Sequence, residues 1–291
     1  MIAGLCAAAG CFSAGCREQV GETESGDSDG TDSPHGDEGG PQGSYQLGGQ
    51  VDGAGGDSGS ENCDPKAITL RALVRDFKAG TEEDGHPDFE TFGGAEPTLG
   101  LVEVELGKKR KPIYTGLCSK PGITETCPNN QQMTTKENFD MWYGASGDDA
   151  PSFEVLLSLA SHAKTISFQA GEFFPLDGVG HGNQGRDHNF HFTTEVHTEF
   201  VYTGGEVFSF TGDDDVWIFI NGKLAVDLGG LHGESTGTVD LDAMAETLGL
   251  TVGQSYPFDL FHAERHTENS RFRIDTNLVF TKCGLAPQSA P

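Results

Sequence analysis

The 291-residue sequence has few basic residues and few long apolar runs. Lys and Arg together number 18 against 45 Asp and Glu, which gives a formal net charge of −27. A chain of this charge repels phosphate backbones, so composition argues against a nucleic-acid partner. Beyond the N-terminus, no apolar run approaches the ~20 residues of a membrane-spanning helix. The sequence also contains no phosphate-binding loop, no dinucleotide fingerprint and no nucleophile elbow in a strand–turn–helix context.

The N-terminal part predicts an anchor followed by a tether. Residues 1–16 are small and apolar and resemble the end of a bacterial lipoprotein signal, with Cys16 preferred over Cys11 for lipidation because charged residues follow it directly. An ordinary cleaved signal is the alternative. Residues 17–62 are mostly Gly, Ser, Asp, Glu and Thr, which cannot bury enough apolar surface to offset the entropy of ordering. We therefore expect a disordered acidic tether, and membrane contact only through a lipid.

Residues 63–285 have the pattern of an antiparallel β-sandwich, with a disordered tail over residues 286–291. Short apolar segments separated by turn residues favour this all-β architecture. Two short helices are expected, one at about 135–143 after a capping-box spacing and one at Leu241–Leu248 closed by Gly249. The expected strands are Ile68–Phe77, Leu101–Leu106, Val155–Leu159, Thr165–Gln169, His188–Thr194, Glu199–Tyr202, Val207–Thr211, Val216–Ile220, Leu224–Leu228, Tyr256–Ala263 and Phe272–Phe280.

Four of the seven cysteines lie in the part of the chain that is expected to fold. Cys63, Cys118, Cys127 and Cys283 are an even number, as suits an exported, oxidised protein. Of the three possible pairings, we prefer Cys118–Cys127 across a Pro/Gly-rich loop and Cys63–Cys283 across the whole domain. Four free thiols would be the expectation for a cytosolic protein.

The segment Phe208–Gly233 reads FSFTGDDDVWIFINGKLAVDLGGLHG and carries the strongest local signals. Asn221-Gly222 between two apolar runs predicts a tight hairpin, because both turn positions need a positive φ. Three adjacent aspartates precede the first run, and their mutual repulsion has to be offset. A hard cation is the simplest means, since carboxylate oxygens suit it. A solvated acidic turn is the alternative.

Several long motifs resemble the fibro-slime domain, which is related to the protective-antigen-like β-sandwich. The resemblance covers roughly Ile68 to Phe280. Its motifs are LVRDFKAG…HPDFE (Leu73–Glu90), FDMWYG (Phe139–Gly144), FFPLDGVGHGNQGRDHNFHFTTEV (Phe173–Val196), the segment Phe208–Gly233 and LGLTVGQSYPFDLFHAERHTENSRFRIDTNLVF (Leu248–Phe280). The resemblance implies a secreted or surface protein that contacts polysaccharide or extracellular matrix.

In the wider superfamily, flocculin-type adhesins bind calcium through two adjacent aspartates, and the calcium holds sugar hydroxyls. Counting back from Asn221-Gly222, this pair corresponds to Asp213 and Asp214, with Asp215 expected at the rim. A second loop, Glu264–Ser270, completes such sites and offers the amide oxygen of Asn269 as a third ligand. The residues expected to contact the bound ligand are Asp215, His232, Glu264, Arg265 and His266.

Two further chemistries compete with this interpretation. His262, Glu264 and His266 would share one face of a regular strand, and His188, His191 and His197 lie close together, so transition-metal binding is an alternative. Asp213 with Glu264 offers two carboxylates of the kind that glycoside hydrolysis needs, but adjacent aspartates more often share a cation.

We therefore predict a non-enzymatic module on the bacterial outer membrane or cell surface, lipid-anchored or secreted. It would recognise polysaccharide or matrix in adhesion with the help of calcium. The alternative is a structural matrix protein with a protein partner, in which the acidic loop only stabilises the fold.

Overall fold

The structure is a computed structural model that describes residues 43–51, 63, 68–122 and 127–283. All of them belong to one compact unit, Gly39–Pro291. The predicted lipidation site Cys16, most of the predicted tether and the predicted tail lie outside the described residues. None of the helices described is long and apolar enough to cross a membrane.

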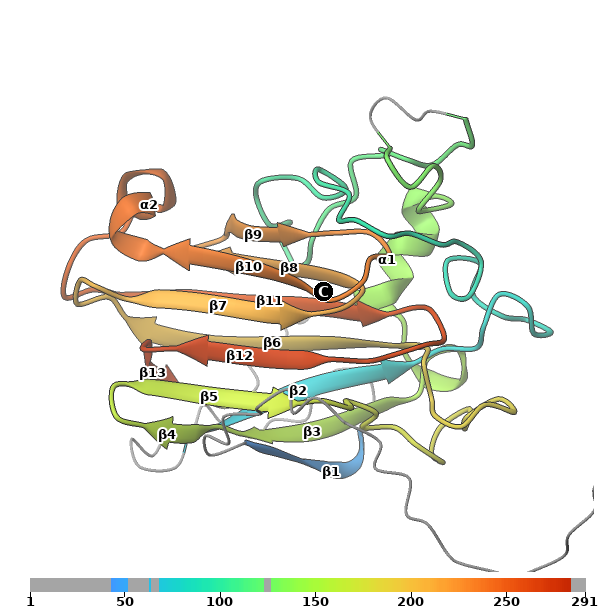
Figure 1. The fold of residues 1–291 in the computed structure, drawn as a ribbon, viewed down its shortest axis with the longest axis horizontal. Coiled ribbons are helices and arrows are strands. Elements are labelled where there is room, and N and C mark those ends of the chain that lie inside the picture. Colours follow the sequence, from blue (N-terminus) through green and yellow to red (C-terminus); the bar gives the residue numbers. More distant parts are fainter. Residues whose placement is uncertain (1–42, 52–62, 64–67, 123–126, 284–291) are drawn as a thin grey trace, which may run out of the picture. The chain divides into compact units, whose positions relative to one another are not determined.

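Two antiparallel sheets face each other, which confirms the predicted β-sandwich (Figure 1). The large sheet contains, in spatial order, β1 (Ser44–Val51), β3 (Ser152–Ser158), β2 (Thr69–Asp76), β6 (Phe192–Val201), β11 (Ser255–Glu264), β8 (Asp215–Ile220) and β9 (Lys223–Leu228), and β13 (Val279–Lys282) pairs with β6. The small sheet contains β10 (Ser235–Asp240), β7 (Val207–Gly212), β12 (Phe272–Thr276), β5 (Thr165–Ala170) and β4 (Ala160–His162).

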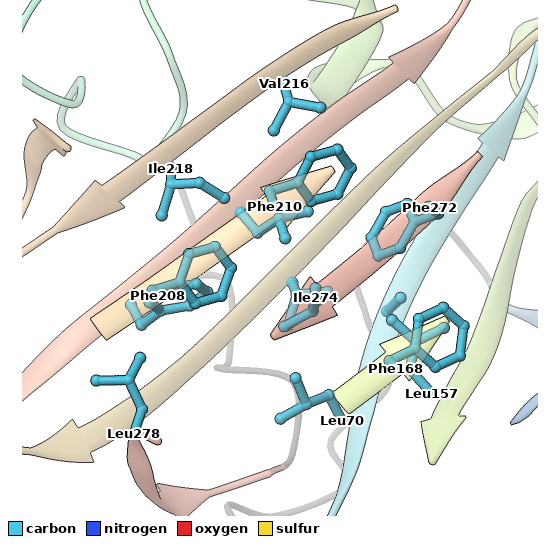
Figure 2. Close-up of a cluster of buried hydrophobic side chains, with 14 of the residues drawn as sticks. Leu70, Leu157, Phe168, Phe208, Phe210, Val216, Ile218, Phe272, Ile274 and Leu278 are labelled. Atoms are coloured by element: carbon cyan, nitrogen blue, oxygen red, sulfur yellow. The ribbon is translucent and has the colours of Figure 1, made fainter. Parts of the chain in front are cut away.

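The main core fills the space between the sheets. Figure 2 shows Val216 and Ile218 of the large sheet among Phe208, Phe210 and Phe272 of the small sheet. These side chains are the inward-facing half of each strand, since successive residues of a strand point to opposite faces. The inner faces of both sheets are thus joined by one continuous apolar layer.

A second core covers the outer face of the large sheet and explains why β8 is apolar on both sides. Helix α1 (Lys136–Gly144) places Phe139 and Trp142 against Trp217, and all six residues of β8 are buried. The expected burial of Trp217–Ile220 is therefore confirmed. The Thr135 hydroxyl accepts a hydrogen bond from the Asn138 amide and caps the helix.

The second helix and the hairpin also follow the sequence. Helix α2 (Leu241–Leu248) begins after Asp240, whose side chain caps it, and ends at Gly249 with φ 71°. The β8–β9 hairpin turns at Asn221 and Gly222, with φ 53° and 74°. A 3-10 turn, η1 (Gly147–Asp149), follows α1.

Five predicted segments differ from the observed elements. Strand β1 lies within the segment 17–62 that was expected to be disordered, because backbone pairing with β3 orders it without requiring many apolar side chains. Leu101–Leu106 forms only isolated bridges. The two strands expected over 188–202 are one strand, β6. The strand expected over Phe272–Phe280 is divided between β12 in the small sheet and β13 in the large sheet.

Both predicted disulfides are present. Cys63 bonds to Cys283 over a sequence separation of 220, and Cys118 bonds to Cys127 over a separation of 9. The Cys63 amide also donates a hydrogen bond to the Thr281 carbonyl, so the long bridge joins two segments that already pair. Two disulfides are typical of a protein that folds in an oxidising compartment.

A buried ionic network occupies the outer face of the large sheet beside the second core. Glu195 pairs with Arg75, with Nη2 to Oε1 at 3.0 Å, and with Lys111. His197 Nδ1 lies 2.5 Å from Asp259 Oδ1, and its Nε2 lies 3.4 Å from Glu195 Oε2. Burial alone lowers the pKa of His197, but the hydrogen bonds and charges of Asp259 and Glu195 outweigh it and raise the pKa above its usual value.

This network predicts a stability difference that depends on pH. Because the folded state holds the His197 proton more tightly than the unfolded chain, the stabilisation is fully present below the unfolded pKa of ~6.5 and is lost as pH rises through the folded pKa. We expect His197→Gln to lower the melting temperature most near pH 5.5 and least near pH 9. The exposed His162→Gln serves as the control in the same melts. A deficit that grows with pH would contradict the assignment.

Candidate functional site

The three aspartates lie where the chain crosses from the small sheet to the large sheet. β7 ends at Gly212, and β8 begins at Asp215. Asp214 takes a left-handed conformation, with φ 49°, which Asp tolerates better than most residues. The crossing therefore turns sharply at Asp213 and Asp214, and both side chains are held at one end of the sandwich.

The predicted second loop clamps this turn. The Asp213 Oδ1 atom accepts a hydrogen bond of 2.6 Å from the Arg271 amide. The Asp214 Oδ2 atom accepts bonds of 2.8 and 3.1 Å from the amides of Arg265 and His266. The structure thus brings together the two segments that the sequence pairs, the acidic turn and the loop between β11 and β12.

Asp215 is buried, so its expected position at the rim is wrong. Its side chain is 0 % exposed, and its Oδ2 atom lies 2.6 Å from Arg265 Nε. The Asp215 Oδ1 atom also accepts a bond of 2.6 Å from the Gly230 amide. Position 215 begins a strand that is covered on both faces, and a carboxylate there needs an internal cation. Arg265 supplies it.

Arg265 is equally buried and does not reach the surface. Its Nη1 atom donates to the carbonyls of Asp88 and Gln132, at 3.1 and 2.9 Å. The guanidinium lies 4.7 Å from the ring centroid of Trp142, a cation–π contact. Asp215 and Arg265 were both expected to contact a ligand, and the structure places both behind the site, where they hold its walls in position.

A cavity of about 370 Å³ opens at the acidic turn. Five of the residues predicted for the site line it: Asp213, Asp214, His232, His266 and Asn269. The opposite wall is formed by Gly93, Gly94 and Ala95, which sequence reasoning missed. Gly94 packs so closely that a Cβ there would overlap the Leu231 carbonyl oxygen. The Gly-Gly pair is the only signal that could have indicated this close approach.

The carboxylates at the cavity repel one another. Burial raises the pKa of Asp213, and burial together with the nearby Asp215 raises that of Asp214 to about 6, against the lowering effect of Arg265. Burial and the charges of Asp214 and Asp213 raise the pKa of Glu264 well above its usual value. The Oε2 atom of Glu264 is buried without a hydrogen-bond partner. Burial therefore disfavours the ionised form of all three carboxyl groups, and neighbouring negative charge adds to this effect at Asp214 and Glu264.

The two histidines at the cavity differ in whether a ligand can reach their ring nitrogens. The ring nitrogens of His232 face the carbonyl oxygens of Gly233 and Leu228 at 2.7 and 3.1 Å, so both nitrogens are directed at the backbone rather than at the cavity. His266 is 40 % exposed, and its Nδ1 atom lies 3.3 Å from the Thr267 carbonyl. Of the pair, His266 is the one that a ligand can reach.

The other histidines are dispersed. His262 is buried among aromatic rings with both nitrogens unpartnered, and β11 ends at Glu264, so His266 does not share a strand face with them as expected. His188 pairs with Asp177, and His191 pairs with Glu90. Among the residues described, no group of three or more His, Cys, Asp or Glu side chains is arranged to hold one metal ion.

Comparison with known proteins shows similarity to one domain family in the C-terminal part of the chain. The PA14 domain model matches residues 182–285. Proteins psiB, psiD and psiR of Dictyostelium discoideum are 43 %, 38 % and 37 % identical to the chain over 237, 230 and 235 residues, which are 74 %, 75 % and 74 % of it. The aligned region is only 40 %, 42 % and 22 % of these relatives. The chain thus spans less than half the length of the relatives it matches.

Among solved structures, the PA14 sugar-binding domain from an RTX adhesin is 13 % identical, with a TM-score of 0.29 over 43 % of this chain and 81 % of that one. The Epa6 A domain of Candida glabrata, solved with Galb1-3GlcNAc, is also 13 % identical, with a TM-score of 0.28 over 83 % of this chain and 87 % of that one. The matched region 182–285 contains the acidic turn and the loop that clamps it. The PA14 domain model thus matches the part of the β-sandwich that holds the candidate site.

Proposed function

We propose that the protein is a cell-surface binding module that recognises polysaccharide or matrix glycans in adhesion, with calcium at the acidic turn. The observation that carries the proposal is the cavity at Asp213 and Asp214, whose carboxylates are held by backbone amides. Arg265 is committed to Asp215 behind the wall. The PA14 match over this region supports the proposal. More specifically, the protein would belong to the fibro-slime domain proteins that its motifs resemble.

The residues present fit a calcium ion. Calcium takes six to eight oxygen ligands and tolerates irregular geometry. Asp213, Asp214 and Asn269 line one cavity. Burial disfavours the charged form of both carboxyl groups, and a bound cation would favour it. Two carboxylates and an amide do not complete the coordination of the ion. Sugar hydroxyls or water would occupy the rest, and the bound ion would supply an electrostatic anchor for vicinal hydroxyls.

The chain's own residues shape what can bind. Gly93 has open space beside it, whereas the Leu231 carbonyl lies directly against Gly94. His266 stands half-exposed at the margin, where a ring nitrogen can hydrogen-bond a hydroxyl. Such a cavity suits the end or a short stretch of a glycan. The proposal is therefore one of binding rather than catalysis, and the two disulfides support the exported location that goes with it.

Thermal melts of the full chain test the calcium site. An ion that binds only the folded state adds about 2.7 kcal/mol at a hundredfold excess over its Kd. For a domain of this size, that raises the melting temperature by roughly 5–10 °C. We expect Asp214→Asn to abolish most of the rise, since it removes a charge but keeps an acceptor for the amides of Arg265 and His266. Asp187→Asn, at an exposed site, should leave the rise intact.

Glycan arrays, read with and without chelator, test recognition itself. Binding that requires calcium and is lost in Asp214→Asn supports the proposal. A calcium-dependent melt without glycan binding, together with self-association of the chain, would favour the structural matrix protein instead. If neither melting nor calorimetry responds to calcium, the acidic turn is a solvated loop.

A further inference from the structure

Four consecutive basic residues form a tight hairpin in this otherwise acidic chain. Residues 107–113, which we name the basic hairpin, read GKKRKPI and hold four of the 18 Lys and Arg residues. The Gly107 amide donates to the Lys111 carbonyl, and the Arg110 amide donates to the Gly107 carbonyl, both at 2.9 Å. The Leu106 amide donates to the Gly222 carbonyl, which ties the hairpin to the β8–β9 turn. The basic side chains are therefore presented from a fixed backbone.

The four cations have different environments. Arg110 and Lys111 turn inward to the ionic network, where Arg110 Nη2 lies 2.5 Å from Asp259 Oδ1 and Lys111 pairs with Glu195. Lys108 and Lys109 are exposed and make no ion pair within the described residues. With Arg75, the network and hairpin bring five cations together against two buried carboxylates. This region is locally positive in a chain of net charge −27.

A cavity of about 340 Å³ lies between the basic hairpin and helix α1. Its wall is apolar and partly aromatic, formed by Pro112, Ile113, Phe139 and Tyr143. The lysines of the hairpin, Lys108, Lys109 and Lys111, also line it. An apolar wall beside a few polar groups is the usual composition of a small-molecule site, and the volume falls within the usual range of about 300–1,000 Å³.

We propose that this cavity binds the anionic groups of an acidic saccharide, a sulfated or carboxylated sugar chain. The apolar wall suits the C–H face of a sugar ring, while Lys108 and Lys109 donate charge-assisted hydrogen bonds to a sulfate or carboxylate. Single-stranded nucleic acid is the competing polyanion in the test. The cavity shares no lining residue with the one at the acidic turn, so the inference goes beyond the proposed function.

Two features would disfavour the binding of an anion in this cavity, and the effect of each is small. The Asp140 carboxylate lines the cavity, but it is exposed and lies 3.4 Å from Lys136 Nζ. Helix α1 ends at Gly144, so its carbonyl end faces this region. Its last carbonyls are partly satisfied, since the Ala145 amide donates to Met141. The lysines at the cavity outnumber the single carboxylate.

Binding of the full chain to dextran sulfate, with neutral dextran as reference, tests the proposal in the presence of a calcium chelator. We expect binding to dextran sulfate that weakens with salt and does not need calcium. The double variant Lys108→Ala/Lys109→Ala should weaken it about tenfold or more, because two charge-assisted contacts are lost. Both lysines are exposed and unpaired, so the variant should melt like the wild type.

The matched control is Lys120→Ala/Lys164→Ala, which removes the same charge from two other exposed positions. An alginate or hyaluronate arm distinguishes carboxylate from sulfate as the recognised group. Equal weakening by both double variants would overturn the site, because binding would then depend only on net charge. Equal affinity for polyaspartate or single-stranded DNA at matched charge would show that the cavity recognises negative charge alone. It would therefore overturn the proposal that the ligand is a saccharide. Loss of binding with chelator would assign the ligand to the acidic turn instead, and so would separate this inference from the proposed function.

Discussion

Replacing Arg265 with alanine is expected to lower the free energy of unfolding by about 3–5 kcal/mol, because it leaves a buried carboxylate without its partner. Asp215 is 0 % exposed and pairs with Arg265 Nε at 2.6 Å. The same substitution removes the cation–π contact with Trp142 and two bonds to the carbonyls of Asp88 and Gln132. For a domain of this size, the melting temperature should fall by roughly 10 °C or more.

Two variants show whether the buried pair causes this loss. Arg271→Ala removes an exposed pair with Glu234, whose side chains are each nearly half exposed, and should cost about 0–1 kcal/mol. Arg265→Met combined with Asp215→Asn removes both charges and should recover part of what Arg265→Met alone loses. The interpretation fails if the double variant is as unstable as the sum of the two single ones.

Removing the Cys63–Cys283 disulfide is expected to have the other large effect. Loop-closure entropy for a separation of 220 residues sets an upper bound of about 5 kcal/mol on its contribution. The corresponding bound for Cys118–Cys127, with a separation of 9, is about 2.5–3 kcal/mol. We therefore expect Cys63→Ser/Cys283→Ser to shift the midpoint of chemical denaturation further than Cys118→Ser/Cys127→Ser. The opposite order would show that local packing, rather than chain entropy, determines the two contributions.

Local sequence signals were sufficient to predict the turns and helix ends, because local backbone conformation determines them. Asn221-Gly222 has both residues at positive φ, as the hairpin requires. Gly249 ends α2 in the left-handed conformation. The Cys63–Cys283 pairing was predicted from a long-range argument instead, because a sandwich can bring its first and last strands together.

Features that depend on distant partners could not be predicted. Asp215 looks like one of three equivalent acidic residues, and only the approach of Arg265 from β11 decides that it is buried. Strand β1 has little apolar pattern, and its order comes from the ladder with β3. The polar pair Asp275 and Thr276 does not reveal that the chain leaves the small sheet before Val279.

The candidate site was only partly predictable, because part of it also depends on segments that are distant in the sequence. The acidic turn and the loop at His266 lie together as expected, since the resemblance paired them in sequence. Gly94 on the opposite wall comes from a segment more than one hundred residues away and carries no chemistry of its own. Position 94 requires glycine for a steric reason, because a Cβ there would overlap the Leu231 carbonyl oxygen. The sequence alone does not show that Leu231 lies next to it.

The long disulfide also determines how the domain would carry mechanical load. The Cα atoms of Cys63 and Cys283 are 5.1 Å apart, so tension applied to the chain before one and after the other passes across a covalent bond. The strands between them, with both cavities, lie outside that path and are not stretched. Of the strands that the structure describes, only β1, which precedes Cys63, stands in line with the force and would peel from β3 first. A domain closed in this way keeps both cavities intact while it is pulled.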